Sequence, residues 1–315
     1  MVQLLPYWTI PTCGNRKCSF KQIRFGVWRS SRFMLGPLLF SIYTSQLFDI
    51  VSKHLPNVHC YADDTQLYLS FKPDNEASQL AALVAMEACI EDIRRWMIHD
   101  KLMLNDDKTE FLLIGTRQVL EKIQIDNLSI GDSAVPASNL ARNLVSWFDN
   151  NMTMETHITK TCKSAFYWLL NLNRIRKYQN KHDTETLLRA LVTSRLDYCN
   201  SLLYGLPNTQ LSKLQRVQNA VARLAYRAPR FFHISPLLFQ LHWLLIRFRI
   251  DFKIILLCFK AIHGLAPTYI SVLISVKSKS SYSLRSNNEL YLVNPSVRMA
   301  SFYPCHPTSY LVLTR

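Results

Sequence analysis

The spacing of apolar residues changes near residue 150, and a different architecture is predicted on each side of that point. Before it, short runs rich in Val, Tyr, Leu and Phe are typical of strands, at 58–71, 108–114 and 124–130. An acidic pair interrupts the first run, which predicts a strand-turn-strand hairpin, and the last run ends at the polar turn Gly131-Asp132.

Two helices are predicted among these strands. One begins at Pro37, because Pro is favoured in the first turn, and runs to about Ser52. The other follows an N-cap at Asp74-Asn75 and reaches about Ile98. Its apolar positions repeat at helical spacing and predict a buried face: Leu83, Met86, Ile90, Ile93 and Met97.

After residue 150 the pattern is helical, and the stretches Gly-Leu-Pro (205–207), Ala-Pro (228–229) and Gly-Leu-Ala-Pro (264–267) separate the runs. The predicted helices are 154–178, 184–204, 208–227 and 236–263. Their apolar positions predict a core: Trp168, Leu187, Leu188, Leu191, Leu196, Leu202, Leu203 and Trp243. The whole chain is therefore predicted to be α+β, an antiparallel sheet with helices followed by a mostly α-helical region.

Composition adds one feature, an uneven distribution of charge. With 49% hydrophobic residues and 7 Gly, the 315-residue chain is predicted to bury a core, which excludes a mostly disordered protein. Residues 1–150 hold 15 Lys and Arg against 16 Asp and Glu, whereas residues 151–315 hold 22 against 6. The net charge of +15 therefore belongs to the second half, and polyanion binding is the commonest reason for such an excess.

The basic residues of the second half gather in two stretches, one at residues 174–177 and the other at residues 216–230. On one helix, Arg216, Arg223, Arg227 and Arg230 would share a face and form a stripe that follows phosphates. The alternative is a solvated basic face without a partner. The candidate nucleic-acid contacts are Arg174, Arg176, Lys177, Arg216, Arg223, Arg227 and Arg230.

The sequence predicts a cytoplasmic or nuclear protein that is not secreted and has no membrane partner. The most apolar stretch, 237–259, is cut by charged residues, and the N-terminus has no basic region ahead of an apolar one. The cysteines form no Cys-x-x-Cys pair, and Cys13, Cys18 and Cys305-His306 match no zinc module by spacing. Buried thiols are expected instead.

The candidate catalytic and metal-binding stretch is Tyr61-Ala62-Asp63-Asp64. Adjacent carboxylates at a hairpin tip bring negative charge to divalent metal ions, and two such ions can activate a hydroxyl and stabilise a leaving pyrophosphate. Because successive strand residues face opposite ways, Asp63 is expected to be the main ligand. Most acidic pairs are plain turn residues, so the flanking sequence is needed to distinguish a metal site from an ordinary turn.

The flanking sequence resembles that of reverse transcriptases. Tyr61-Ala62-Asp63-Asp64 is similar to the catalytic box of the family, Leu-Gly-Pro at 35–37 lies upstream, and Leu-x-x-Asn-x-x-Lys-Thr follows at 102–109. Five later stretches look like the C-terminal region of the jockey and chicken-repeat group of non-LTR (LINE-type) retrotransposons. They are 194–200, 214–220, 241–244, 264–269 and 282–286. The resemblance covers about residues 15–298 and implies a C-terminal fragment.

The resemblance implies the palm of an RNA-directed DNA polymerase, followed by a helical thumb. Asp63 and Asp64 would be the catalytic carboxylates, which bind two Mg²⁺ ions. Tyr61, Asn105 and Lys108 would contact the substrate, with Lys108 acting on phosphate as a point charge. RNA template and DNA primer are the implied partners, and no small-molecule cofactor is implied.

Two departures from the family pattern predict an inactive enzyme. The family has a third metal-binding carboxylate on an earlier strand, whereas no Asp or Glu precedes Asp49 here. Two carboxylates would hold two Mg²⁺ ions poorly, since Mg²⁺ requires near-octahedral oxygen ligation. In addition, Trp28 and Arg29 replace the family's Pro-Gln-Gly turn, where the backbone has to approach the template.

The predicted layout has four parts: a degenerate, poorly ordered segment (1–33), a partial palm (34–150), a helical thumb-like and C-terminal region (151–300) and a tail (301–315). Three hypotheses remain open. The chain is an active polymerase, a truncated relic that binds RNA or DNA without catalysis, or a domesticated scaffold whose helices contact proteins.

Overall fold

A computed structural model describes residues 35–102, 104–105, 108–131, 133–274, 292 and 309–314 of the chain. The predicted N-terminal disorder, the altered turn with Trp28 and Arg29, and the stretch 282–286 lie outside these residues. So do the thiols of Cys13, Cys18 and Cys305. Among the thiols that are described, Cys89 is buried and the other four are half-buried, so the expectation of buried thiols holds for Cys89 alone.

The protein is α+β and divides into two compact units. Residues 1–143 together with 307–315 form the first unit, and residues 144–306 form the second. The division falls a few residues before the change of pattern near residue 150, and the predicted tail contributes to the first unit. The names palm and thumb for the two regions stay predictions.

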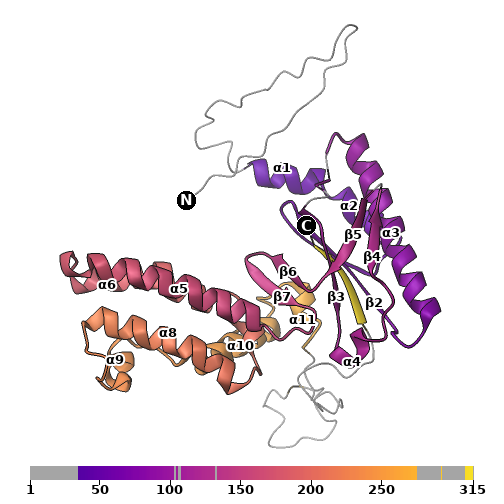
Figure 1. Cartoon of the computed structure of the whole chain (residues 1–315). Coiled ribbons are helices and arrows are strands. Elements are labelled where there is room, and N and C mark those ends of the chain that lie inside the picture. The colour runs from indigo at the N-terminus through magenta and orange to yellow at the C-terminus, as the bar shows by residue number, and fades with distance from the viewer. Residues whose placement is uncertain are drawn as a thin grey trace, which may run out of the picture. The chain divides into compact units, whose positions relative to one another are not determined.

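A six-stranded sheet organises the first unit, in the order β1-β2-β8-β3-β5-β4 (Figure 1). Strands β3 and β5 pair in parallel, whereas the other neighbouring strands pair antiparallel. The bounds are β1 (Asn57–Tyr61), β2 (Asp64–Phe71), β3 (Glu110–Ile114), β4 (Asn127–Ile130), β5 (Ser133–Ser138) and β8 (Ser309–Thr314). The three predicted strand runs are confirmed, while β5 and β8 were not predicted.

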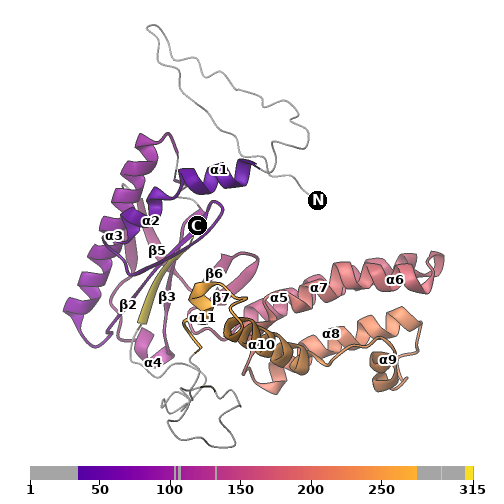
Figure 2. The same cartoon turned by 180° about the vertical axis from the view of Figure 1, so that it is seen from behind.

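Helix α3 (Glu76–His99) connects β2 to β3 and covers one face of the sheet (Figures 1 and 2). Its predicted cap is confirmed, because the Asn75 side chain accepts a hydrogen bond of 3.3 Å from the Ser78 backbone N–H. Of the predicted apolar positions, Leu83 is partly buried and the rest are buried. The helix therefore forms because an amphipathic face has a sheet to pack against.

The helix predicted from Pro37 to Ser52 is two helices, which corrects the sequence interpretation. They are α1 (Leu35–Tyr43) and α2 (Gln46–Val51). Hydroxyl side chains at the break bond to carbonyls of α1, as Thr44 Oγ1 does to Phe40 O at 2.9 Å, and this competes with a continuous helix. Only α2 contributes buried residues to the core among the described parts of the two helices.

Two more strands and a short helix complete the elements before residue 150. Helix α4 (Arg117–Leu120) follows β3. Strands β6 (Leu140–Asn143) and β7 (Ser146–Asp149) form a separate two-stranded sheet where the chain leaves the first unit. The backbone between them has positive φ at Leu144 and Val145, which is a tight turn.

The second unit is built from helices, and α5 and α8 lie side by side in both views (Figures 1 and 2). The α-helices are α5 (Glu155–Ile175), α6 (Lys181–Leu188), α7 (Ser194–Asp197), α8 (Asn208–Tyr226), α9 (Ile234–Gln240), α10 (Ile246–Ile262) and α11 (Thr268–Ser271). Short segments of other helix types lie between some of them. They are the 3₁₀ turns η2 (Arg176–Tyr178) and η4 (Asn200–Leu203) and the π-helical turn η3 (Arg189–Thr193).

Two of the four helices predicted here are broken. The run 184–204 ends as a helix at Asp197, and Cys199 adopts a left-handed φ of 51° before η4. The run 236–263 is interrupted between α9 and α10, where His242 has a φ of 53°. Apolar spacing continues through both breaks, so periodicity does not reveal them.

The core of the second unit agrees with the prediction except at one position. Leu188, Leu196 and Leu203 are buried, and Trp168, Leu187, Leu191 and Trp243 pack partly buried against them. Leu202 is 43% exposed, because the 3₁₀ turn rotates it away from the face that a continuous helix would bury.

Candidate functional site

The acidic pair lies at the tip of an exposed hairpin, as predicted. Tyr61 and Asp64 are the last paired residues of β1 and β2, so Ala62 and Asp63 form a two-residue loop. Ala62 has a φ of 55°, which this short turn requires at its first position. Tyr61 is 69% exposed, Asp63 is exposed and Asp64 is half-buried. The carboxylates are therefore presented at the surface.

Strand alternation separates the hairpin into two faces. Leu67 and Phe71 are buried against α3, and alternate residues of a strand face the same side. Asp64 and Gln66 therefore belong to the opposite face, together with Tyr68, whose hydroxyl lies 3.0 Å from His59 Nε2. The Asp64 face of β2 is thus polar, while its other face packs into the core of the unit.

The described carboxylates do not assemble a two-metal site. Among the described residues, no group of three or more His, Cys, Asp or Glu is placed to hold a metal ion. The next acid at this end of the sheet is Glu110, which is separated from Gln66 by Thr314 in the strand register. Its Oε2 accepts a hydrogen bond of 2.8 Å from the Arg142 backbone N–H. The hairpin pair is therefore short of the ligands that two Mg²⁺ ions require.

Lys108 and Asn105 lie just before β3, at the end of the sheet that holds the hairpin tip. Asn105 O accepts hydrogen bonds from the Lys108 backbone N–H at 3.2 Å and from Thr109 Oγ1 at 3.1 Å. This turn buries Thr109 and leaves Lys108 exposed. Both residues thus lie at the end of the sheet that holds the hairpin tip, and their role in substrate binding stays a prediction.

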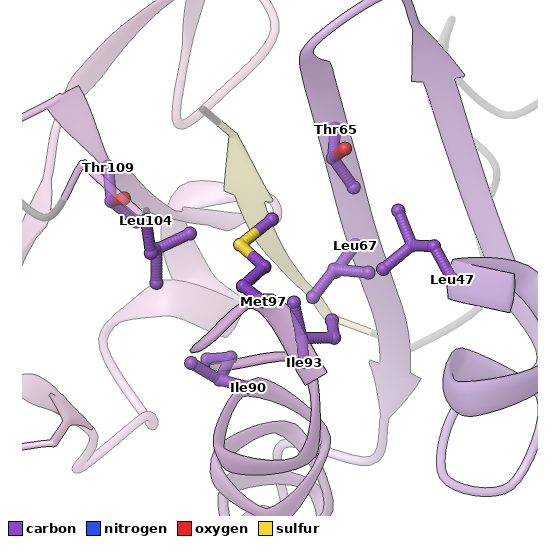
Figure 3. Close-up of a pocket in the computed structure, with 8 residues that line it drawn as sticks. All are labelled: Leu47, Thr65, Leu67, Ile90, Ile93, Met97, Leu104 and Thr109. Atoms are coloured by element: carbon purple, nitrogen blue, oxygen red, sulfur yellow. The ribbon is translucent and has the colours of Figure 1, made fainter. Parts of the chain in front are cut away.

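A small apolar cavity lies beneath this end of the sheet (Figure 3). It has a volume of about 30 Å³. Thr65 and Thr109 approach it from opposite sides, and Met97 projects from α3 between them. Its size is that of one water molecule, so it is not a nucleotide site. Its lining is completed by Leu47, Leu67, Ile90, Ile93 and Leu104.

The segment that contains this hairpin matches the model of a known protein family. Residues 24–141 match the family model for reverse transcriptase (RNA-dependent DNA polymerase). This segment is similar to a reverse transcriptase domain. The match spans the hairpin, α3 and β3 to β5, but it covers less than half of the chain. No curated protein and no solved structure matches the chain. Polymerases of this family generally use divalent metal ions and bind a nucleic-acid template and primer.

The candidate nucleic-acid residues of the second unit differ in how accessible they are. Arg176 is only 7% exposed, and its guanidinium donates to Leu224 O at 3.1 Å and to Gln179 O and Ala225 O at 2.9 Å. Burial, and next the charge of Arg227, lower the pKa of Arg176. Arg176 therefore caps the C-terminal end of α8 from within the unit.

The predicted arginine stripe along α8 is wrong in its second half. The helix ends at Tyr226, and Arg227 follows with a left-handed φ of 52°, so Arg227 and Arg230 do not continue the helical face. Arg223 is half-buried, and its Nη2 donates to Phe232 O at 3.5 Å. The exposed candidates are Arg174, Lys177, Arg216, Arg227 and Arg230.

A half-buried ion pair between Asp197 and Arg249, which the sequence did not reveal, joins α7 to α10. Arg249 Nη1 donates to both Asp197 carboxylate oxygens, at 2.7 and 2.6 Å, and its guanidinium lies 5.6 Å from the centre of the Trp243 ring. These residues hold α7 against α10. Their separation of more than 50 positions in sequence gives no local signal.

None of the helices in the described part of the chain combines the length and the apolar character needed to cross a membrane.

Proposed function

We propose that the chain is a C-terminal fragment of the reverse transcriptase of a non-LTR (LINE-type) retrotransposon, which binds RNA and DNA in the cytoplasm or nucleus but no longer polymerises. The observation that carries the proposal is the exposed hairpin tip at Asp63 and Asp64, inside the segment that matches reverse transcriptases. The family-like stretches of the second unit support the LINE assignment.

The proposed loss of polymerase activity rests on the carboxylates. Asp63 and Asp64 would supply oxygen ligands for Mg²⁺ at the tip, with Tyr61 beside them and Lys108 at the same end of the sheet. The described residues add no third carboxylate there, so the ligand set does not fit a two-ion centre. We therefore assign the pair weak binding of a single divalent ion and derive no transfer step from it.

The proposed binding of nucleic acid rests on the second unit. Residues 151–315 carry 22 Lys and Arg against 6 Asp and Glu. Arg174, Lys177, Arg216 and Arg230 are exposed, and so is Arg227, whose Nη2 also donates to Arg176 O at 2.9 Å. Phosphate contacts of this kind release counterions, so binding should weaken steeply with salt, by a slope of about −0.9 per contact on duplex DNA in a log–log plot.

Primer extension on an RNA template with Mg²⁺ tests the proposal, with the Asp63→Ala variant run beside the parent chain. We expect no extension by either chain, together with equal binding of an RNA–DNA duplex that falls as salt rises. Extension by the parent chain that disappears in the variant would show an active polymerase. Absence of duplex binding at low salt would exclude the nucleic-acid function.

A protein-contact role is a second candidate, because one helix of the second unit exposes an apolar stripe. Phe248, Phe252, Ile255 and Phe259 follow one face of α10 and are each at least 52% exposed. A scaffold that uses this face would bind protein with little dependence on salt. The Phe252→Ser variant should then lose the protein partner and keep duplex binding, whereas Arg216→Gln should do the reverse.

A further inference from the structure

Strands β2 and β3 leave room for one strand between them. Both pair antiparallel with β8, so they run parallel to each other, and α3 makes the crossover from one to the other. The described residues between 72 and 109 contain no strand, so the crossover leaves this position unfilled. A gap of this kind exposes two rows of backbone N–H and C=O groups and spans about 10 Å, twice the strand spacing.

The register defines which segment fits this gap, named here the strand slot. β8 pairs at six positions with β2 and at five with β3. Leu313 takes the position between Leu67 and Phe111, which are 3% and 0% exposed. The strand slot therefore accepts an extended segment of about six residues, antiparallel to both neighbours and apolar at the positions next to the core.

The segment that fills the strand slot is synthesised long after the other strands of its sheet. Gln66 pairs with Thr314, so this contact joins residues that are separated by most of the described chain. The other strands of this sheet end by Ser138, and along the sequence the second unit lies between them and β8. At roughly 5–20 residues per second, synthesis leaves the strand slot without its strand for about 10–30 s. Contacts of such long range also form slowly during folding.

We propose that the strand slot accepts β8 from a second copy of this chain, giving a strand-exchanged dimer. A second copy offers the same sequence, so the exchange restores pairing at both edges of the slot and creates no new kind of contact. Two copies that meet before their own strands close are the species that exchange, and the dimer fraction rises with concentration during folding. Strand exchange requires neither metal binding nor nucleic-acid binding.

Cysteine pairing between full-length chains tests the proposal. Ser70 and Tyr310 are register partners, and the Cα separation of antiparallel partners suits a disulfide. A Ser70→Cys chain and a Tyr310→Cys chain are mixed in denaturant, refolded together and oxidised, and the linked peptides are identified by mass spectrometry. We expect a disulfide between the two chains whose yield rises with protein concentration.

The matched control replaces Tyr310→Cys by Leu311→Cys, the next position, which belongs to the opposite face of the strand. Its yield should be several-fold lower. Excess synthetic peptide of residues 307–315 added during refolding should suppress the disulfide, while a scrambled peptide should not. The proposal is overturned if the disulfide forms only within a chain that carries both substitutions, if the control links equally well, or if no 70–310 disulfide forms.

Discussion

The two units use charged residues in opposite ways. In the first unit, the two-residue turn of Ala62 and Asp63 has no room to bury the carboxylate of Asp63, and Asp64, which follows it, is half-buried. In the second unit, the candidate arginines lie on helices and in the turns that follow them, and Arg176 is buried because the end of α8 supplies carbonyl groups that need donors. A charge at a tight turn is thus exposed by local geometry, whereas tertiary packing decides whether a charge on a helix reaches solvent.

The largest expected effect tests whether the units are separate at all. Phe111 is fully buried in the first unit and Leu188 in the second. Phe111→Ala should lower the free energy of unfolding of the first unit by about 3–5 kcal/mol, and Leu188→Ala that of the second by about 2–5 kcal/mol. Hydrogen exchange measured by mass spectrometry in urea resolves the units. Equal loss of protection in both units after either substitution would contradict the division.

A smaller effect separates the two kinds of arginine. Arg176→Ala removes three hydrogen bonds from a charged donor to carbonyls and should destabilise the second unit by about 2–3 kcal/mol. Arg216→Ala, at an exposed position, should change stability by less than about 0.5 kcal/mol but reduce the salt slope of duplex binding by about 1. Urea unfolding and binding titrations at several salt concentrations provide the two readouts. A large stability change for Arg216→Ala would undo the contrast.

The ligand shortage at the hairpin can be reversed by one substitution. Thr314 is the register partner of Gln66, two positions along β2 from Asp64, which places the two Cα atoms about 8 Å apart. Thr314→Asp should therefore tighten Mn²⁺ binding about tenfold, equivalent to ~1.4 kcal/mol. Thr314→Asn is the control of equal size without charge. If both variants bind Mn²⁺ as the parent does, β8 does not adjoin the acidic pair.

The smallest effect is a difference in sensitivity to acid. Burial lowers the pKa of His157, whose Nδ1 accepts a hydrogen bond of 3.4 Å from the Trp147 backbone N–H. The unfolded chain takes up this proton from about pH 6.5, so the second unit should lose stability as pH falls below that value. In the first unit, the hydrogen bond to His54 lowers the pKa of Asp92, so its contribution to stability is present above about pH 3.8 and is lost as pH falls below that value.

Urea unfolding followed by hydrogen exchange at pH 7.5, 5.5 and 3.5 checks this order. The second unit should weaken first, and His157→Gln, which keeps a polar side chain but cannot titrate, should remove that step. Weakening of the first unit between pH 7.5 and 5.5, with the second unchanged, would reverse the assignment.

Much of the fold could be predicted from local sequence. The hairpin, α3 with its Asn75 cap, and β3 all follow from patterns confined to a few residues. The errors have physical causes that local patterns do not contain. At the break between α1 and α2, the Thr44 hydroxyl bonds to a carbonyl of α1, and the stripe on α8 fails because Arg227 turns left-handed to end the helix.

For the candidate site, the sequence by itself determined the acidic turn, because an Asp pair between two β-prone runs is expected at a turn. It also determined that the excess of basic residues belongs to the second half of the chain. Only the tertiary structure decided that β8 lies beside that turn and that Arg176 is internal. Strand partners and helix-end contacts join residues that are far apart along the chain. Their energy depends on unpaired backbone groups that exist only once the rest of the fold has formed.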